Sequence, residues 1–225
     1  MLGEEGRGVY TNGHLSDAPF LNMKQDKTKS FNMDCLKFMA SVPDKFYDLA
    51  IVDPPYGIDR NNMNMGNSVF NKDNKKWDSS IPNSEYFKEL FRISKNQIIW
   101  GGNYFGLPPS QYFAIWDKGE TMYGRDFAEA EYAWVYKGGT RIFKKNPNQP
   151  ERIHPTQKPV NLYEWLLMNY AKEGDKILDT HGGSQSSRIA CFNLGFELDI
   201  IELDKDYFDQ GNKRFEQHKK QLTLF

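Results

Sequence analysis

Short apolar runs that end in polar or turn-forming residues recur along the chain and predict buried strands. They are "YDLAIVD" (47–53), "NQIIW" (96–100), "YFAIWD" (112–117), "EYAWVYK" (131–137), "KILD" (176–179) and "DIIELD" (199–204). Unbroken apolar runs of this length are typical of strands whose two faces are both covered, as in parallel sheets.

Helical spacing appears between these strands. In "VNLYEWLLMNYA" (160–171) four residues recur at the spacing of one buried helix face: Tyr163, Leu166, Leu167 and Tyr170. A second helix is predicted over 186–194, and Gly195 directly after it is a typical C-terminal cap. Strands separated by helices predict an α/β fold with a mostly parallel, doubly wound sheet.

Composition narrows the class of protein. The chain has 225 residues, 39% hydrophobic and 26% charged, which suits one globular domain. No apolar run reaches the roughly 18 residues that span a bilayer, so no membrane contact is expected. Cys35 and Cys191 are the only cysteines, too few for a disulfide framework, so we expect a reducing cytoplasm. The net charge is −1, so binding to nucleic acid would need a local basic patch.

The first chemical signal is "IVDPPYG", which places Asp53, Pro54, Pro55 and Tyr56 after a predicted strand. Ligands of open α/β sheets bind at this end of the strands. Two prolines stiffen the backbone and give the Pro54 carbonyl a fixed direction. A carboxylate, an aimed carbonyl and an aromatic ring could together hold the exocyclic amine of a base. The alternative is an ordinary turn at the end of a strand.

The second signal is "ILDTHGGSQSSRIACFNLGFELDIIELD", a strand, a glycine turn, a helix and a strand. Gly182 and Gly183 allow a ligand to approach the backbone closely, and Glu202 follows Gly182 by 20 residues. At this spacing a carboxylate meets a ribose diol in nucleotide-binding βαβ units. The alternative is a tight turn without a ligand.

Together these motifs resemble the beta-class, circularly permuted DNA amino-methyltransferases, of the bacterial or phage adenine-N6 type, which use S-adenosylmethionine. In that group "DPPY" precedes the cofactor loop, as it does here. Two further stretches, "NMDCLKFMASVPDKFYDLAIVDPPYG" (32–57) and "HPTQKPVNLYEWLL" (154–167), also resemble the family. The resemblance covers roughly residues 31–210 and implies a Rossmann-like fold. It also implies a protein of the bacterial cytoplasm that associates with the nucleoid.

The resemblance implies a role for each matching residue. Asp53, Pro54, Pro55 and Tyr56 would hold the target amine and its base. The cofactor contacts would come from Asp34, Thr156, Lys158, Asp179, His181, Gly182, Gly183, Ser184 and Glu202. In this scheme Asp34 approaches the adenine and Glu202 the ribose. The alternatives are a helix N-cap for Asp34 and a surface charge for Lys158.

The cofactor loop departs from the family pattern. Thr180 and His181 replace the usual Pro-Phe, and Gln185 replaces a glycine at which the backbone usually approaches the cofactor. The flat ring of His181 could take the place of the phenylalanine. We expect no metal site, because neither His154 nor His181 belongs to a cluster of ligands with suitable spacing.

The expected activity is methyl transfer to the N6 amine of an adenine flipped out of duplex DNA. Cytosine N4 is the alternative target, because "DPPY" favours adenine only as a tendency of the family. The same motifs are compatible with an RNA base-amine methyltransferase, and with a DNA-associated binding module whose cofactor loop has decayed. The sequence is compatible with the presence or absence of a cognate restriction enzyme. It is also compatible with a monomer or a homodimer.

We divide the chain into a mobile lead-in (1–28), a methyltransferase domain (29–217) and a tail (218–225). Loops at 61–80 and 137–153 are candidates for DNA contact. Phosphate contacts are expected from the basic residues Lys137, Arg141, Lys144, Lys145 and Arg152, and Trp77 could fill the gap left by a flipped base. A solvated basic loop is the alternative.

The chain ends in "QLTLF", an apolar tip after a charged run. The pentapeptide resembles the short motif that binds the bacterial DNA sliding clamp. Its expected contacts are Gln221, Leu222, Leu224 and Phe225, with 217–220 as a polar tether. The alternative is a last helical turn packed on the sheet.

Overall fold

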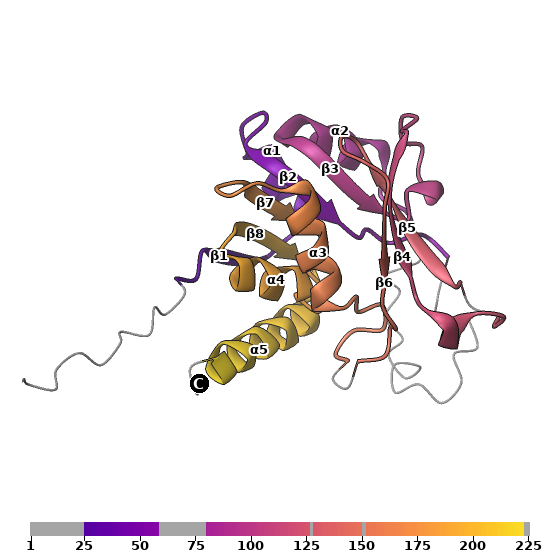
Figure 1. The fold of residues 1–225 in the computed structure, drawn as a ribbon. Coiled ribbons are helices and arrows are strands. Elements are labelled where there is room, and N and C mark those ends of the chain that lie inside the picture. Colours follow the sequence, from indigo (N-terminus) through magenta and orange to yellow (C-terminus); the bar gives the residue numbers. More distant parts are fainter. Residues whose placement is uncertain (1–24, 59–79, 127, 150–151, 223–225) are drawn as a thin grey trace, which may run out of the picture.

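A computed structural model describes residues 25–58, 80–126, 128–149 and 152–222. One eight-stranded sheet runs through the molecule in the order β1-β8-β7-β2-β3-β5-β4-β6 (Figure 1). The strands are β1 (Thr28–Asn32), β2 (Tyr47–Val52), β3 (Ser94–Trp100), β4 (Tyr112–Asp117), β5 (Ala130–Val135), β6 (Arg141–Lys144), β7 (Lys176–Asp179) and β8 (Glu197–Glu202). Among these described strands, only β5 pairs antiparallel, with β3 and β4. The predicted α/β fold with a mostly parallel sheet is confirmed.

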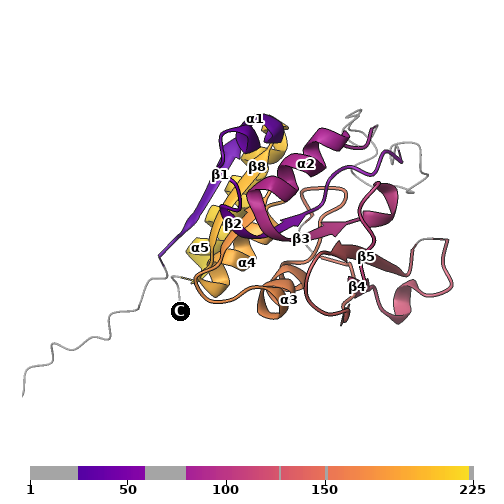
Figure 2. The ribbon, with the colours of Figure 1, turned by 90° about the horizontal axis from the view of Figure 1, so that it is seen from above.

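Helices cover both faces of this sheet. They are α1 (Cys35–Ala40), α2 (Ser84–Ile93), α3 (Val160–Tyr170), α4 (Ser186–Leu194) and α5 (Lys205–Leu222), with short 3-10 helices η3 (Gly102–Tyr104) and η4 (Glu120–Met122). Seen from above, α1 and α2 lie on one side of the sheet and α3 and α4 on the other (Figure 2). In the described ranges, no helix combines the length and apolar character needed to cross a membrane.

The two-sided cover explains the unbroken apolar runs of the strands. In β3, Ile98 and Trp100 pack in the cluster beneath α3 and α4, whereas Ile99 packs in the cluster beneath α1 and α2. All three side chains are fully buried. Because successive side chains of a strand point to opposite faces, both parities must be apolar when both faces are covered.

Three features differ from the expected organisation. Residues 28–40 form β1 and α1, so the main domain begins one residue before the predicted boundary. The predicted loop 137–153 contains the edge strand β6, which pairs in parallel with β4. The predicted tether 217–220 is helical, because α5 continues to Leu222. Most of the predicted lead-in and of the loop 61–80 lies outside the described residues.

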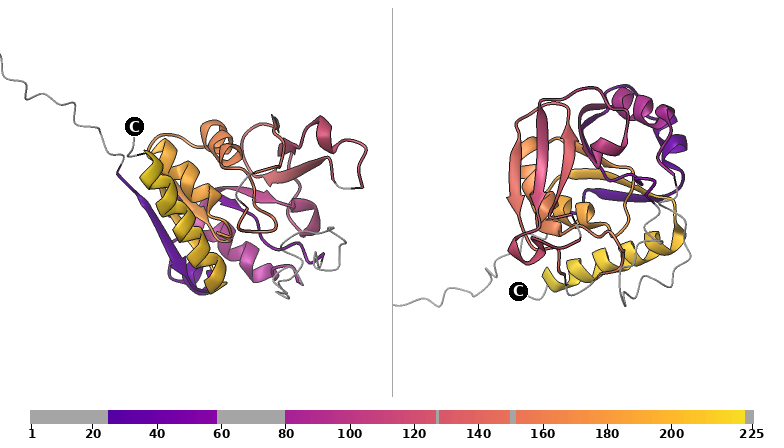
Figure 3. Two further views of the ribbon diagram at one scale, coloured as in Figure 1. Left: turned by 90° about the horizontal axis from the view of Figure 1, so that it is seen from below. Right: turned by 90° about the vertical axis from the view of Figure 1, so that its right-hand side faces the viewer.

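Helix α5 lies along β1 and α4 at one edge of the sheet (Figure 3). Its buried residues Tyr207, Gly211 and Phe215 recur every fourth position, so the helix presents one narrow stripe to the protein. Phe215 is fully buried against Ile189 and Phe192 of α4. This packing places α5 directly behind the turn between β7 and α4.

Candidate active site

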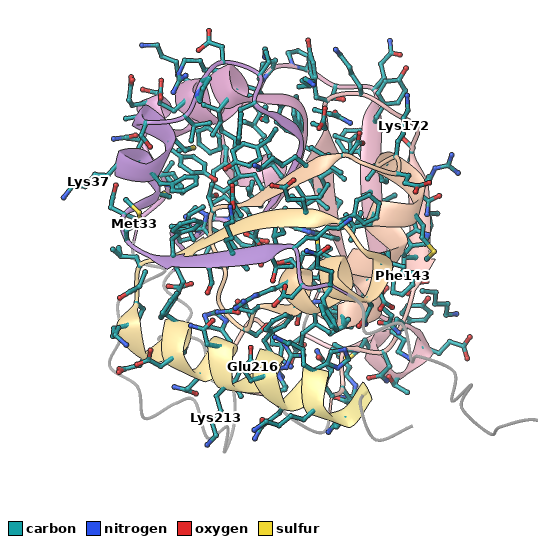
Figure 4. All side chains as sticks on the ribbon, turned by 90° about the vertical axis from the view of Figure 1, so that its left-hand side faces the viewer. Met33, Lys37, Phe143, Lys172, Lys213 and Glu216 are labelled. Atoms are coloured by element: carbon teal, nitrogen blue, oxygen red, sulfur yellow. The ribbon has the colours of Figure 1, made fainter. Side chains whose placement is uncertain are left out.

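A cavity of about 490 Å³ opens where β2, β7 and β8 end. It is lined by Met33, Asp34, Cys35, Asp53, Pro55, His154, Thr156, Gln157, Lys158, Tyr163, Thr180, His181, Gly182, Gly183, Ser184, Glu202, Leu203, Asp204 and Tyr207. Figure 4 shows Met33 just beyond the end of β1, with Lys37 pointing outward from α1. The carboxyl ends of parallel strands meet at one edge of a sheet, which explains why the two predicted motifs share this cavity.

Asp53 lies at the floor of the predicted amine site, where both of its oxygens already accept hydrogen bonds. The Tyr56 hydroxyl donates to Oδ1 over 2.6 Å, and the Lys158 ammonium donates to Oδ2 over 2.5 Å. A carboxylate offers about four acceptor positions, so Asp53 keeps room for a substrate amine. Pro55 lines the cavity, whereas Pro54 is buried and does not.

The ring of Tyr56 is fixed by residues that follow β3. Tyr104 of η3 stacks on it, with ring centroids 4.9 Å apart and an interplanar angle of 11°. Gly101 has a φ of +66°, and a Cβ there would lie 2.3 Å from the Tyr56 ring. One face of the predicted base-stacking ring is therefore covered by Tyr104. The signal for this contact was the "GGNY" directly after a predicted strand.

Glu202 at the end of β8 ties the glycine turn to the next segment. Its Oε2 accepts from the Gly183 amide over 2.7 Å, and its Oε1 accepts from the Asp204 amide over 2.8 Å. Burial raises the pKa of this carboxyl. Gly182 completes the turn by donating its amide hydrogen to the Ile201 carbonyl over 2.8 Å. The predicted carboxylate and the predicted glycines thus form one unit that lines the cavity.

The other predicted cofactor residues surround this unit. Asp34 lines the cavity. It is also the N-cap of α1, where it accepts a hydrogen bond from the Lys37 amide over 2.9 Å, so its two alternative positions in the sequence analysis are both occupied. Thr156 Oγ1 lies 3.1 Å from His154 Nδ1. His181 contacts Tyr86 edge to face at 5.4 Å, and burial lowers the pKa of its imidazole to about 4. His181 is therefore neutral at pH 7.

Asp179 does not line the cavity, contrary to the sequence prediction. Only 2% of the residue is exposed, and it accepts hydrogen bonds from the Ser187 hydroxyl over 2.6 Å and the His181 amide over 3.0 Å. Burial raises the pKa of its carboxyl to about 7. Asp179 thus supports the loop from behind, because β7 ends one residue before the chain turns into the cavity.

Gln185 also lies away from the cavity, although it replaces a glycine of the family pattern. Its backbone is left-handed, with φ 56° and ψ 30°, which explains why glycine suits this position. Its side chain points to α5, where Nε2 lies 3.2 Å from Asn212 Oδ1, while Oε1 accepts from Arg188 over 3.0 Å. The substitution leaves the cavity open.

Several residues that line the cavity were missed by sequence reasoning. His154 packs edge to face on Tyr207 at 4.4 Å, and Tyr163 of α3 lines the same cavity. Asp204 caps α5 by accepting from the Asp206 amide over 2.9 Å. The signal for Asp204 and Tyr207 was their place directly after Glu202.

The sequence of residues 106–213 matches the N6_N4_Mtase family model, which describes DNA methylases. The chain is also 23% identical to Type II methyltransferase M2.DpnII of Streptococcus pneumoniae, over 91% of this chain and 94% of that protein. The chain is related to the DNA amino-methyltransferases. This relationship confirms the resemblance to DNA amino-methyltransferases, whereas the permuted motif order and the adenine-N6 type stay predictions.

Two solved methyltransferase structures share the fold. The M1.HpyAVI–SAM complex matches with a TM-score of 0.55 at 19% identity, covering 83% of this chain and 99% of that one. The cytosine-N4-specific PvuII DNA methyltransferase matches with a TM-score of 0.56 at 12% identity, covering 86% and 92%. At these identities the likeness concerns the fold, and it confirms the Rossmann-like prediction.

The basic residues predicted to contact DNA lie on the edge strand β6 and in the segments before and after it. Lys137, Arg141, Lys144, Lys145 and Arg152 are all exposed. Lys144 pairs with Glu120 over 3.0 Å, so its charge is partly neutralised, and Arg152 donates to the Pro155 carbonyl. The sequence did not indicate the pairing of Lys144, because Glu120 comes from η4, more than 20 residues earlier. Trp77 lies outside the described residues.

The predicted clamp-binding peptide begins in the last turn of α5. Gln221 is an exposed residue of the last helical turn, and Leu222 is the last residue of the helix. Leu224 and Phe225 lie outside the described residues, so binding to a sliding clamp stays a prediction.

Gly211 of α5 is expected to tolerate no side chain while Gln185 is present. A Cβ at Gly211 would lie 2.6 Å from Gln185 Cγ. Gly211→Ala should therefore destabilise the protein by about 1–3 kcal/mol, although alanine normally favours a helix. In the double variant Gln185→Gly/Gly211→Ala, most of the loss should disappear, because the clashing atoms are gone. Urea denaturation of the four proteins measures the coupling, and additive effects would contradict the contact.

Proposed function

We propose that this protein transfers a methyl group from S-adenosylmethionine to the exocyclic amine of a base in DNA. One observation carries the proposal: Asp53 and Pro55 of the "DPPY" motif line the same cavity as the Gly182–Gly183 turn and Glu202. An amine site and a nucleoside site are thus adjacent. The DNA methylase family match and the methyltransferase relative support DNA as the substrate.

The chemistry of the cavity suits S-adenosylmethionine, which is cationic at sulfur. Its lining carries the carboxylates of Asp34, Asp53, Glu202 and Asp204 against the single ammonium of Lys158. Such a wall favours a cation and disfavours a phosphate. The volume of about 490 Å³ is in the range of small-molecule sites.

In this proposal each wall of the cavity holds one part of the cofactor. Glu202 accepts hydrogen bonds from the ribose hydroxyls, since its two oxygens retain free acceptor positions. Asp34 lies at the adenine end. The backbone of Gly183 and Ser184 lies beside the methionine moiety, with Thr156 opposite. When bound, S-adenosylmethionine supplies an electrophilic methyl group.

The residues of the "DPPY" turn prepare the amine. The lone pair of an exocyclic amine is delocalised into the base, which makes the nitrogen a poor nucleophile. Asp53 and the Pro54 carbonyl accept its two N–H hydrogens, which favours tetrahedral geometry and frees the lone pair. Tyr56 offers its ring to the flipped base, and its hydroxyl keeps Oδ1 of Asp53 in place.

We propose adenine N6 as the target, because the motif begins with Asp53 and "DPPY" goes more often with adenine in the family. Cytosine N4 is the second candidate, because the cytosine-N4-specific PvuII enzyme has a similar fold. Lys137, Arg141 and Lys145 are exposed and would supply phosphate contacts on DNA.

Mass spectrometry of nucleosides tests this proposal. DNA of mixed sequence is incubated with the protein and S-adenosylmethionine, then digested, with boiled protein as the control. We expect 6-methyladenine. A product of 4-methylcytosine alone would reverse the choice of base, and methylation of structured RNA but not DNA would identify an RNA enzyme. If calorimetry detects no binding at millimolar S-adenosylmethionine, the chain is a binding module.

A further inference from the structure

Lys158 is a buried cation shared between two carboxylates. Only 3% of its side chain is exposed. Its ammonium lies 2.5 Å from Asp53 Oδ2 and 3.3 Å from Glu131 Oε2, and 5.0 Å from the centre of the Trp100 ring. A buried ammonium is stable only when it is paired, so both carboxylates contribute to holding it there.

Glu131 comes from a different part of the fold than Asp53 and Lys158. It belongs to β5, whereas Asp53 follows β2 and Lys158 precedes α3. Glu131 is itself held by Lys118, whose ammonium lies 2.9 Å from Oε1, and the two side chains are 19% and 13% exposed. Glu131 does not line the cavity. It therefore lies outside the proposed cofactor site.

Charge sharing sets how strongly Asp53 can act as an acceptor. If Lys158 paired with Asp53 alone, its full charge would neutralise the carboxylate and weaken its hydrogen bond to a substrate amine. If Lys158 were absent, the carboxylates of Asp53 and Glu131 would lose the ammonium that both of them contact. With Glu131 in place, Lys158 is shared between two carboxylates, and because Lys118 pairs with Glu131 in turn, the four side chains together carry no net charge.

We propose that Glu131 is a positioning residue for methyl transfer, which acts on Asp53 through the shared ammonium of Lys158. This inference rests on the proposed function of the site. It assigns a role in the reaction to a residue of β5 that neither motif contains. The role of Glu131 is to hold the Lys158 ammonium in place, so that Oδ2 of Asp53 is correctly oriented.

Three variants test the role of Glu131. Glu131→Gln keeps the size of the side chain and removes its charge, and Glu131→Asp keeps the charge. Glu129→Gln is the matched control, because Glu129 is an exposed residue nearby whose carboxylate accepts a hydrogen bond from the Gly124 amide. Steady-state methylation of DNA gives kcat, and calorimetry gives the Kd of S-adenosylmethionine.

We expect Glu131→Gln to lower kcat by about 10- to 100-fold, the effect of a misplaced catalytic group. The cofactor Kd should stay unchanged, Glu131→Asp should recover part of kcat, and Glu129→Gln should match the wild type. A Glu131→Gln variant with wild-type kcat would overturn the inference, and so would an equal loss in Glu131→Asp.

A stability measurement separates this inference from the proposed function. Glu131→Gln and Lys158→Met are combined in a double-mutant cycle of urea denaturation. Coupling between the two substitutions supports the shared ammonium, and strict additivity overturns it. If the wild-type protein transfers no methyl group to any nucleic acid, the proposed function fails, while the cycle still decides whether Glu131 and Lys158 are coupled.

Discussion

Replacing Asp53 by alanine should lower kcat for methyl transfer by about 100- to 1,000-fold, the loss seen when one essential polar contact to a reacting group is removed. The variant loses the acceptor for the amine hydrogens, and the nitrogen lone pair stays delocalised. Binding of S-adenosylmethionine should change little, because Asp53 is assigned to the amine. Steady-state kinetics measures the change in kcat, and calorimetry measures the change in cofactor affinity.

Asp44→Ala is the control for this experiment, since Asp44 is an exposed carboxylate that pairs with Arg92 away from the cavity. It should retain wild-type kcat and Kd. If Asp53→Ala keeps more than a tenth of the wild-type turnover, the assignment of Asp53 to the amine is wrong. An equal loss of cofactor affinity would move Asp53 into the cofactor site instead.

Replacing Glu202 by alanine should weaken S-adenosylmethionine binding by about 10- to 100-fold, because hydrogen bonds to a charged group contribute about 1.5–3 kcal/mol. Two causes combine. The ribose hydroxyls lose their acceptor, and the amides of Gly183 and Asp204 lose the carboxylate that now fixes both. Calorimetric titration of the folded variant measures the change in Kd.

Glu197→Ala is the matched control, because Glu197 is the first residue of the same strand and pairs with Lys176 at the opposite end. Its Kd should equal that of the wild type. An unchanged Kd in Glu202→Ala would show that the cavity binds its ligand without this carboxylate. Thermal denaturation of both variants checks that neither result reflects unfolding.

The sequence predicted the elements whose cause is local. The strands β4 and β7 have the predicted bounds, because their apolar runs end where polar residues begin. Helix α5 was not predicted, because its buried stripe of Tyr207, Gly211 and Phe215 is narrow and includes a glycine. β6 was missed for a similar reason: a four-residue edge strand with two basic side chains is indistinguishable from a basic loop.

In the candidate site, the motifs predicted which residues gather but not how they pair. Asp53, Gly183 and Glu202 were identified from spacing within short segments. The pairing of Lys158 with Asp53 joins residues 105 positions apart, and no local pattern encodes it. The direction of the Gln185 side chain could not be predicted from the sequence either, because it depends on contacts with α5, which packs behind the loop.

The contact between Gln185 and Gly211 also restricts the order in which glutamine at 185 and a larger residue at 211 could be introduced. A chain with alanine at 211 would lose stability on accepting glutamine at 185, whereas a chain with glycine at both positions would not meet this clash. Grafting the "THGGSQSS" loop onto another methyltransferase scaffold would therefore require the matching face of α5 to be transferred with it.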